Sequence, residues 1–367
     1  MKDLTDIAGL TVAVIGGGNV GTQFACVCAS KGSEVRIYTS RCREFADTLE
    51  LVDEFGHLTR GTIKLATDDI SEALKDADVI FVTTPAFMLE AIAEKMLPHI
   101  EKDQVILVLP GTGGAEFAFH DCLRKGAILS GVQRVPAVAR LEGYGRRVRC
   151  EGLRKEMFLA SVPRRYAADI SELISDLFGI PCTPLPNYLC VTLTPSNPIL
   201  HTTRLRTLFK DYREGVTYDR IPKFYGEWSD ESAELLLKCD RELQDMIALM
   251  DQADLTSVKS LKIHYESDDV PSLTRKLKSI ESLHALPTPM LKVEGGYIPD
   301  FDSRYFKADF PYGLAILESF AEVLDYDATN IKETMDWYIK TTGDCRSLSL
   351  EEHDITTVQD IYDFYHC

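Results

Sequence analysis

A glycine-rich stretch near the start of the chain constrains the fold more than any other feature. Residues 12–21 read VAVIGGGNVG, so an apolar run leads directly into glycines with the spacing G-x-G-x-x-G. In this pattern the first glycine permits a tight turn, the second lets backbone approach a pyrophosphate, and the third lets a helix pack closely on the strand. A plain strand-to-helix turn can look similar, but the apolar run before it and the helical stretch after it favour a dinucleotide site. The predicted cofactor-binding residues of this turn are Gly16, Gly18, Asn19, Val20 and Gly21.

The first half of the chain alternates short apolar runs with helical stretches. Several of the runs are continuously apolar, which is typical of strands that are covered on both faces of a parallel sheet. The pattern predicts an α/β fold that begins with a Rossmann-type, doubly wound parallel sheet. The expected strands are 11–16, 34–38, 77–84, 104–110, 126–132, 146–153, 156–163 and 181–185, with a helix over 166–178 before the last.

The second half has almost no β-rich runs and instead shows apolar residues at three- and four-residue spacing. It predicts an all-helical C-terminal domain. We expect the dinucleotide-binding domain to span residues 1–188 and the helical substrate domain to span 189–367. The expected helices of the second domain are 232–253, 271–283, 313–326, 330–340 and 356–365.

Charge and composition exclude several classes of partner. The formal net charge is −17, with 57 acidic and 40 basic residues, which disfavours binding to nucleic acid. No apolar run is long enough for a membrane span, and the N-terminus lacks a secretory core. The ten cysteines are scattered without a disulfide framework, and the eight histidines show no metal-ligand spacing. We therefore expect a cytoplasmic protein with no metal site.

The residues that follow the second expected strand bear on the choice of dinucleotide. NAD-selective sites usually place an acidic residue there to bind the ribose 2′-hydroxyl. This chain has Thr39, Ser40 and Arg41 instead, and two hydroxyls with a guanidinium suit a 2′-phosphate. NADP(H) is therefore favoured, and NAD(H) remains the alternative. Thr84 and Pro85 end another expected strand at its carboxyl edge, where they are predicted to contact the cofactor.

Two segments of the second half carry unusual combinations of residues. The first is Asn197-Pro198-Ile199-Leu200-His201, in which His201 taken alone would be a packing or capping histidine. The second spans 303–314 and contains Arg304, Asp309 and a Pro-Tyr-Gly-Leu stretch, which taken alone would be a surface loop before a helix.

Taken together, these segments resemble the NAD(P)-dependent octopine/nopaline (opine) dehydrogenase family. In that family an Asn-Pro-x-x-His motif carries the catalytic histidine, and an arginine precedes an aspartate by five residues ahead of Pro-x-Gly-Leu. The resemblance extends over nearly the whole chain, including a C-terminal domain like that of 6-phosphogluconate dehydrogenase. The chain departs from the family after the histidine, where several members have Pro or Gly and this sequence has Thr202-Thr203-Arg204.

The resemblance implies an oxidoreductase that condenses an amino acid with a 2-keto acid and reduces the resulting imine with NAD(P)H. It implies that His201 and Asp309 are catalytic, with His201 as the acid and base and Asp309 holding its tautomer. It further implies that Arg304 and Asn197 bind substrate, Arg304 by clamping a carboxylate. The identities of the amino acid and the keto acid stay open, as do a homodimer and a metal-chelating product.

Two other functions remain open from the sequence. A 2-keto acid or ketopantoate-type reductase shares the two-domain layout, although no lysine motif opens the second domain and Lys210 lies well past the expected helix start. A non-catalytic NADP-binding sensor would keep the glycine pattern but would have no reason to keep a His–Asp pair.

Overall fold

The computed structural model describes residues 2–366, and the chain divides into two compact units, Met1–Thr192 and Leu193–Cys367. The short helix α7 (Leu189–Thr192) belongs to the first unit, four residues beyond the predicted boundary. Side chains of this unit bind the α7 segment: Gln133 Nε2 donates to the carbonyl of Cys190 at 2.9 Å, and the Tyr188 hydroxyl donates to the carbonyl of Gly111 at 3.0 Å.

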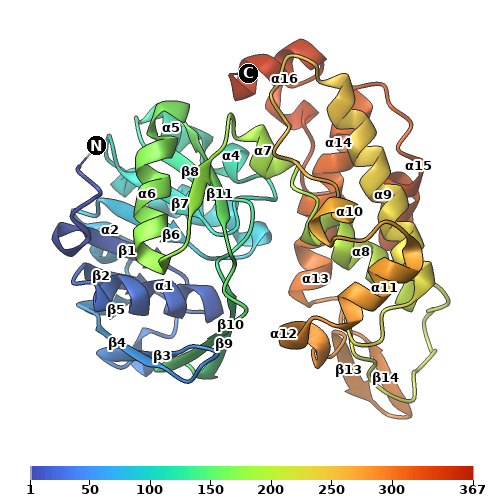
Figure 1. Ribbon diagram of the computed structural model, residues 1–367, viewed down its shortest axis with the longest axis horizontal. Helices are drawn as coiled ribbons and strands as arrows, with labels where there is room; N and C mark the ends of the chain where they lie inside the picture. Colours follow the sequence, from blue (N-terminus) through green and yellow to red (C-terminus); the bar gives the residue numbers. More distant parts are fainter. Residues whose placement is uncertain (1, 367) are drawn as a thin grey trace. The chain divides into compact units, whose positions relative to one another are not determined.

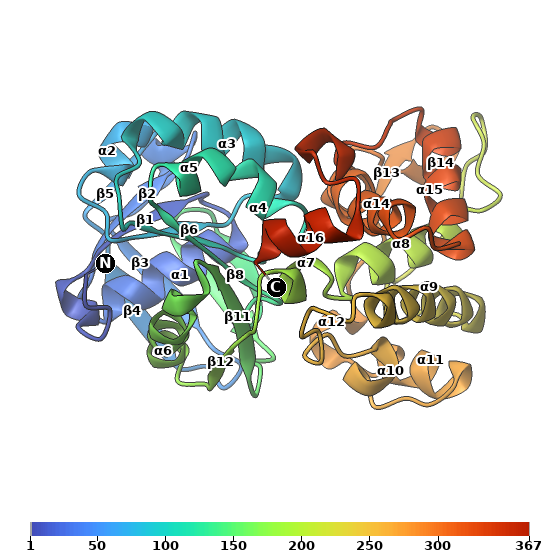
Figure 2. The ribbon, with the colours of Figure 1, turned by 90° about the horizontal axis from the view of Figure 1, so that it is seen from above.

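The first unit is built on an eight-stranded sheet in the order β12-β11-β8-β7-β6-β1-β2-β5. Helices α1 (Asn19–Ser30) and α6 (Ala167–Phe178) cover one face, and α2 (Ile70–Leu74), α3 (Leu89–Met96) and α5 (His120–Arg124) cover the other (Figures 1 and 2). The predicted doubly wound α/β fold is confirmed. The strands are β1 (Thr11–Ile15), β2 (Glu34–Tyr38), β5 (Leu65–Thr67), β6 (Val79–Val82), β7 (Val105–Val108), β8 (Ile128–Val132), β11 (Met157–Val162) and β12 (Cys182–Pro184).

One edge of this sheet departs from the parallel arrangement. Strand β11 runs antiparallel to β8, and β12 is parallel to β11, so two strands oppose the other six. The chain between β8 and β11 forms two further strands instead of a crossover helix. It therefore re-enters the sheet from the edge at which β8 ended, and β11 must run in the opposite direction.

A second, four-stranded sheet has the order β4-β3-β10-β9 and contains the run predicted as a strand at 146–153. Strands β3, β4, β5 and β9 lie outside the predicted strands, because their residues mix charged, small and apolar side chains without a long apolar run. The strands of the second sheet are β3 (Thr48–Val52), β4 (Leu58–Thr62), β9 (Val138–Gly143) and β10 (Arg147–Glu151).

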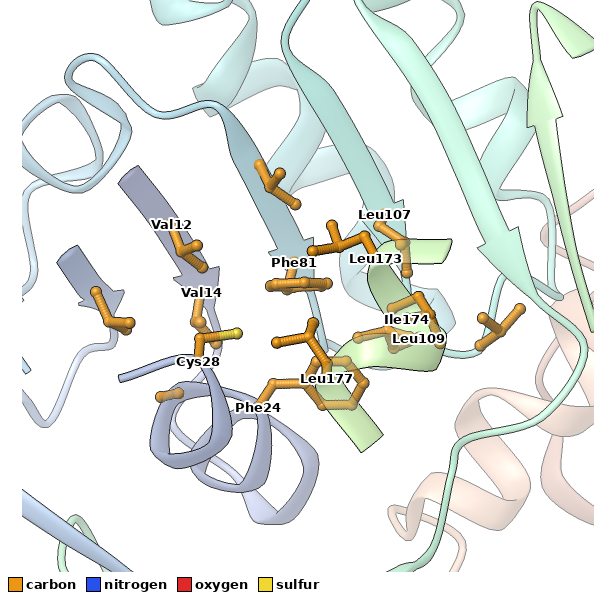
Figure 3. Packing of buried hydrophobic residues seen from close by; sticks show 14 of the residues in the cluster. Val12, Val14, Phe24, Cys28, Phe81, Leu107, Leu109, Leu173, Ile174 and Leu177 are labelled. Atoms are coloured by element: carbon orange, nitrogen blue, oxygen red, sulfur yellow. The ribbon is translucent and has the colours of Figure 1, made fainter. Parts of the chain in front are cut away.

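The core of the first unit explains why the apolar runs form buried strands. Phe24 of α1 packs between Phe81 of β6 and Phe178 of α6, with ring centroids 5.0 and 4.8 Å away. Figure 3 shows strand and helix side chains meeting on this face of the sheet. This packing fixes β1 and α1, and with them the glycine turn that connects the two elements. The labelled residues of the cluster are Val12, Val14, Phe24, Cys28, Phe81, Leu107, Leu109, Leu173, Ile174 and Leu177.

The second unit is mainly helical, as predicted, with one two-stranded hairpin of β13 (Met290–Val293) and β14 (Gly296–Pro299). The helix predicted over 271–283 is divided, because α11 ends at Lys278 and α12 begins at Glu281. The helices are α8 (Asn197–Leu208), α9 (Asp230–Leu249), α10 (Leu261–His264), α11 (Val270–Lys278), α12 (Glu281–His284), α13 (Arg304–Lys307), α14 (Ala315–Val323), α15 (Thr329–Thr342) and α16 (Val358–Tyr365).

Between residues 2 and 366, no helix is both long and apolar enough to cross a bilayer. Every cysteine that the structure describes is a free thiol. Over the same residues, no group of three or more His, Cys, Asp or Glu side chains could hold a metal ion.

Candidate functional site

The glycine turn between β1 and α1 has the geometry that a dinucleotide requires. Gly16 has a φ of +112°, a conformation that favours glycine. A Cβ on Gly21 would lie 1.8 Å from the carbonyl oxygen of Gly16, so the helix can approach the turn only because residue 21 has no side chain. A Cβ on Gly18 would meet nothing within 4 Å, so open space lies beside the backbone at the start of α1.

The end of β6 lies beside this turn. A Cβ on Gly16 would lie 2.7 Å from the Thr83 hydroxyl and 3.5 Å from the Thr84 methyl group. The Thr84 hydroxyl is buried and has no hydrogen-bond partner, whereas Thr83 donates to the carbonyl of Ile15 at 3.0 Å. Strand β6 (Val79–Val82) ends three residues before Pro85, which is extended and precedes the short helical turn Ala86–Met88. An open glycine turn next to an unpartnered buried hydroxyl fits a bound dinucleotide.

Strand β9 and the β9–β10 turn also contact the glycine turn and the end of β2. Asn19 accepts a hydrogen bond from the main-chain N–H of Leu141 at 2.9 Å, which ties the start of α1 to β9. Thr39 shares a hydrogen bond of 2.8 Å with the hydroxyl of Tyr144, in the β9–β10 turn. A Cβ on Gly17 would lie 2.9 Å from the same hydroxyl, so Tyr144 lies against the glycine turn.

The guanidinium of Arg41 is already engaged by two neighbouring side chains. It forms a two-point ion pair with Glu44, in which Nε lies 2.6 Å from Oε1 and Nη2 pairs with Oε2. Its guanidinium also lies over the Tyr144 ring, 3.7 Å from the centroid. The hydrogen bonds from Arg41 lower the pKa of the Glu44 carboxyl below its usual value. Residues 39–41 contain no acid, but Glu44 places a carboxylate beside Arg41 at the end of β2.

In the helical unit the structure brings His201 and Asp309 together across 108 residues of sequence. Nδ1 of His201 lies 2.8 Å from Oδ2 of Asp309. The His201 side chain is 4% exposed and that of Asp309 is 13% exposed, so both lie mainly out of water. A carboxylate accepts a hydrogen bond from Nδ1–H, which leaves Nε2 of the neutral imidazole as the nitrogen that can accept a proton.

A close contact between the two sequence segments explains this convergence. Asp309 begins a wide helical turn, η6 (Asp309–Leu314), in which the N–H of Gly313 donates to the carbonyl of Ala308 at 3.1 Å. A Cβ on Gly313 would lie 2.9 Å from the Pro198 ring, so only glycine lets this turn pack on the first turn of α8. The Pro-x-Gly-Leu stretch thus positions Asp309 by packing on the Asn-Pro-x-x-His motif.

Aromatic rings surround the imidazole. The ring centroids of Tyr305 and Phe224 lie 4.4 and 5.4 Å from that of His201. The Tyr225 hydroxyl lies 3.0 Å from Nε2 of His201, so both imidazole nitrogens have partners.

The two remaining predicted site residues lie at helix starts of the same unit. Asn197 is the first residue of α8 and is half-buried. Arg304 is the first residue of α13, is exposed, and lies with its guanidinium carbon 5.7 Å from the Tyr305 ring centroid. Helices α8 and α13 contact one another (Figure 1), which places both residues in the neighbourhood of the His–Asp pair.

Comparisons with known proteins agree with this arrangement. Residues 184–342 match the family model of the NAD/NADP octopine/nopaline dehydrogenase alpha-helical domain, and residues 11–116 match that of the NAD-dependent glycerol-3-phosphate dehydrogenase N-terminus. The octopine dehydrogenase of Pecten maximus is 28% identical over 84% of this chain and 84% of its own length. The helical unit therefore matches the octopine/nopaline dehydrogenase family, and the chain is similar to octopine dehydrogenases over most of its length.

Solved structures show how far this family's fold is shared. A structure of octopine dehydrogenase in complex with NADH and agmatine has a TM-score of 0.80 at 22% identity, covering 96% of this chain and 98% of that one. A ketopantoate reductase from Ralstonia eutropha has a TM-score of 0.60 at 17% identity, covering 90% and 97% of the two chains. Both classes therefore share the fold, and the match of residues 184–342 to the octopine/nopaline dehydrogenase helical domain separates the two.

Four residues at these sites are absent from the sequence prediction. Tyr144 and Glu44 contact the residues that follow β2. The Tyr225 hydroxyl contacts His201, and Arg204 is hydrogen-bonded to the main chain on both sides of Tyr225. None belongs to a motif. Glu44 reaches Arg41 through a local turn, and the other three make their contacts through the tertiary fold. The only sequence signal was the departure from the family pattern at Thr202-Thr203-Arg204.

Proposed function

We propose that this protein is a pyridine-nucleotide-dependent oxidoreductase that acts on CH–NH bonds, condensing an amino acid with a 2-keto acid and reducing the product. The single observation that carries the proposal is the 2.8 Å contact between His201 Nδ1 and Asp309 Oδ2 in a helical unit that matches the octopine/nopaline dehydrogenase family. The acid–base chemistry of the condensation needs such a pair.

The residues of the first unit fit the dinucleotide. The pyrophosphate would lie in the open space beside Gly18, facing the main-chain N–H groups at the start of α1. Thr84 offers its unpartnered hydroxyl at the neighbouring strand end. When bound, the nicotinamide supplies the hydride that reduces the imine carbon.

The helical unit would supply proton transfer. Attack of the amine on the keto carbon gives a carbinolamine, and its hydroxyl must gain a proton before it can leave as water. The imidazolium form of His201 is the proton source, and histidine both gives and takes protons near neutral pH. Asp309 orients the ring through Nδ1 and stabilises its charged form, without itself becoming protonated.

Arg304 and Asn197 would bind the substrates. A 2-keto acid carries its carboxylate directly on the reacting carbon, and a guanidinium binds a carboxylate with two parallel hydrogen bonds. Arg304 is exposed at the start of α13 and five residues before Asp309, so it can hold that carboxylate while the neighbouring carbonyl faces the acid–base pair. Asn197, at the first position of α8, supplies an uncharged amide to the same substrates.

A substrate-pair screen tests the reaction. We expect oxidation of the reduced dinucleotide, followed by its absorbance, only when a 2-keto acid such as pyruvate and an amino acid are both present. Turnover with the keto acid alone would instead indicate a keto-acid reductase. Dinucleotide binding without turnover for any pair would indicate a sensor.

We further propose that the chain takes NADP(H) through Thr39, Ser40 and Arg41, and that Glu44 limits its preference over NAD(H). The Arg41–Glu44 ion pair competes with a 2′-phosphate for the guanidinium. We expect Glu44→Gln to raise the ratio of NADPH to NADH affinity by about 10-fold and Arg41→Ala to lower it by about 10-fold. Titration of both dinucleotides checks the two changes, and equal ratios in both variants and the wild type would exclude this role.

A further inference from the structure

The hydrogen bonds of His201 leave no free nitrogen for a substrate. Asp309 takes the Nδ1 side at 2.8 Å, and the Tyr225 hydroxyl takes the Nε2 side at 3.0 Å. In the neutral imidazole Nε2 has a single lone pair, so it accepts a hydrogen bond from one donor at a time. A proton that passes between the imidazole and a substrate must therefore go through the phenol, or the phenol must move away.

The main chain on both sides of Tyr225 is held from the helix that carries His201. Arg204, one turn further along α8, donates from Nε to the carbonyl of Phe224 at 3.0 Å and from Nη2 to the carbonyl of Glu227 at 2.7 Å. Its third nitrogen donates to the Ser232 hydroxyl at 3.0 Å. Burial lowers the pKa of Arg204 only to about 10, so the guanidinium stays charged at neutral pH.

The ring of Tyr225 is also held. It stacks with Trp228 at 6.0 Å between centroids and meets Phe224 edge-on at 5.1 Å. The residue is 6% exposed, so turning the hydroxyl away from His201 would break packing as well as the hydrogen bond. A side chain held at its main chain and on its ring faces favours a fixed proton-conducting group over a displaceable one.

The electrostatic surroundings of the hydroxyl suit this task. Burial raises the pKa of Tyr225 well above its ordinary value, and nearby tyrosines and Asp309 raise it further, so the phenol keeps its proton at neutral pH. The Arg304 guanidinium carbon lies 5.7 Å from the Tyr305 ring centroid, which lies 4.4 Å from the ring centroid of His201. The proposed carboxylate-binding residue is therefore near the imidazole that contacts the Tyr225 hydroxyl. In a 2-keto acid the carbonyl oxygen lies next to the carboxylate, so Arg304 would bring the reacting oxygen toward this phenol.

We propose that Tyr225 is the outer member of an Asp309–His201–Tyr225 proton relay, in which the phenol and not the imidazole exchanges the proton with the reacting oxygen. This inference rests on the function proposed above. The Nε2 proton of the imidazolium moves to the Tyr225 oxygen while the phenol proton moves to the carbinolamine hydroxyl, which leaves as water. The imidazole ends neutral, the tyrosine is unchanged, and Arg204 is a positioning residue for the relay.

Kinetics of Tyr225→Phe test the relay. With the keto acid and amine pair found by the screen, we expect kcat to fall about 10²-fold while the KM of the keto acid changes by less than about threefold. The control is Tyr218→Phe, which removes a phenol hydroxyl of the same unit whose ring packs on Phe209 and Tyr212. It should keep kcat within about twofold.

Two results would overturn the relay while leaving the proposed function in place. The first is a Tyr225→Phe variant with a wild-type kcat and an unchanged KM for the keto acid. The second is a variant with a wild-type kcat and a lowered KM, which would mean that the substrate displaces the hydroxyl. If Tyr225→Phe does not fold, single-turnover rates of the wild type in mixtures of H₂O and D₂O decide the matter. Two protons moving together give a curved dependence on deuterium content, and a straight line would refute the relay. Absence of amine-dependent turnover in the wild type would overturn both proposals.

Discussion

Replacing His201 with alanine should lower turnover by about 10²–10⁴-fold while leaving dinucleotide affinity within about twofold. The variant loses the histidine that is paired with Asp309, so the relay that delivers the proton needed to expel water loses its source. The glycine turn that would bind the dinucleotide belongs to the other unit and keeps its residues. Steady-state kinetics with the active substrate pair and a separate dinucleotide titration measure the two effects.

Asp309→Asn is the matched variant for the same prediction. Its amide nearly preserves the volume of the carboxyl, but it removes the negative charge and can present N–H to Nδ1, which favours the wrong imidazole tautomer. We expect a fall in turnover in the same range. Because most of the pair is out of water, both variants should also lose about 1–3 kcal/mol of folding free energy. Turnover must therefore be measured well below the melting temperature of each variant. Turnover close to wild type in either variant would remove the pair from catalysis.

The second large effect is expected at the glycine turn. In Gly21→Ala the new methyl group would lie 1.8 Å from the Gly16 carbonyl, and main-chain atoms on both sides cannot yield without moving α1 away from β1. We expect a loss of about 3 kcal/mol or more in folding free energy and at least about 100-fold weaker dinucleotide binding. Thermal melting and nucleotide titration measure these losses.

Gly18→Ala is the control for this turn, because nothing lies within 4 Å of its Cβ position and its φ is −83°. The free protein should melt within a few degrees of the wild type. Its dinucleotide affinity should nevertheless fall about 10-fold or more, because the methyl group would occupy the space proposed for the pyrophosphate. Unchanged affinity in Gly18→Ala would mean that this space does not receive the phosphates.

The Rossmann-type start of the chain was predictable because its determinants are local. The run Val12–Ile15 is buried on both faces, and the roles of Gly16 and Gly21 follow from their places between a strand and a helix. The second sheet was harder to predict from the sequence. The run at 146–153 does contain β10, but its partners are β3 and β9, and nothing in the run itself specifies them. Strand pairing depends on residues far away in sequence.

The end of β2 shows a different limit. Residues 39–41 contain no acid, and this pattern favours NADP(H). The structure brings Glu44 back onto Arg41 through a short turn and places Tyr144 over the guanidinium from 103 positions further along the chain. A cofactor preference inferred from residues 39–41 alone ignores Glu44 and Tyr144, which compete with a 2′-phosphate for the Arg41 guanidinium.

By itself the sequence determined the order of the two domains, the glycine turn, and the two short motifs that contain His201 and Asp309. These features depend on local periodicity and on residues that few backbone conformations allow. The tertiary structure alone decided that Gly313 packs on Pro198 and so joins the motifs, and that Arg204 holds Tyr225 at Nε2 of His201. The segment around Tyr225 has no motif, and its position depends on a buried guanidinium whose hydrogen-bond partners are main-chain carbonyls, which any residue could supply.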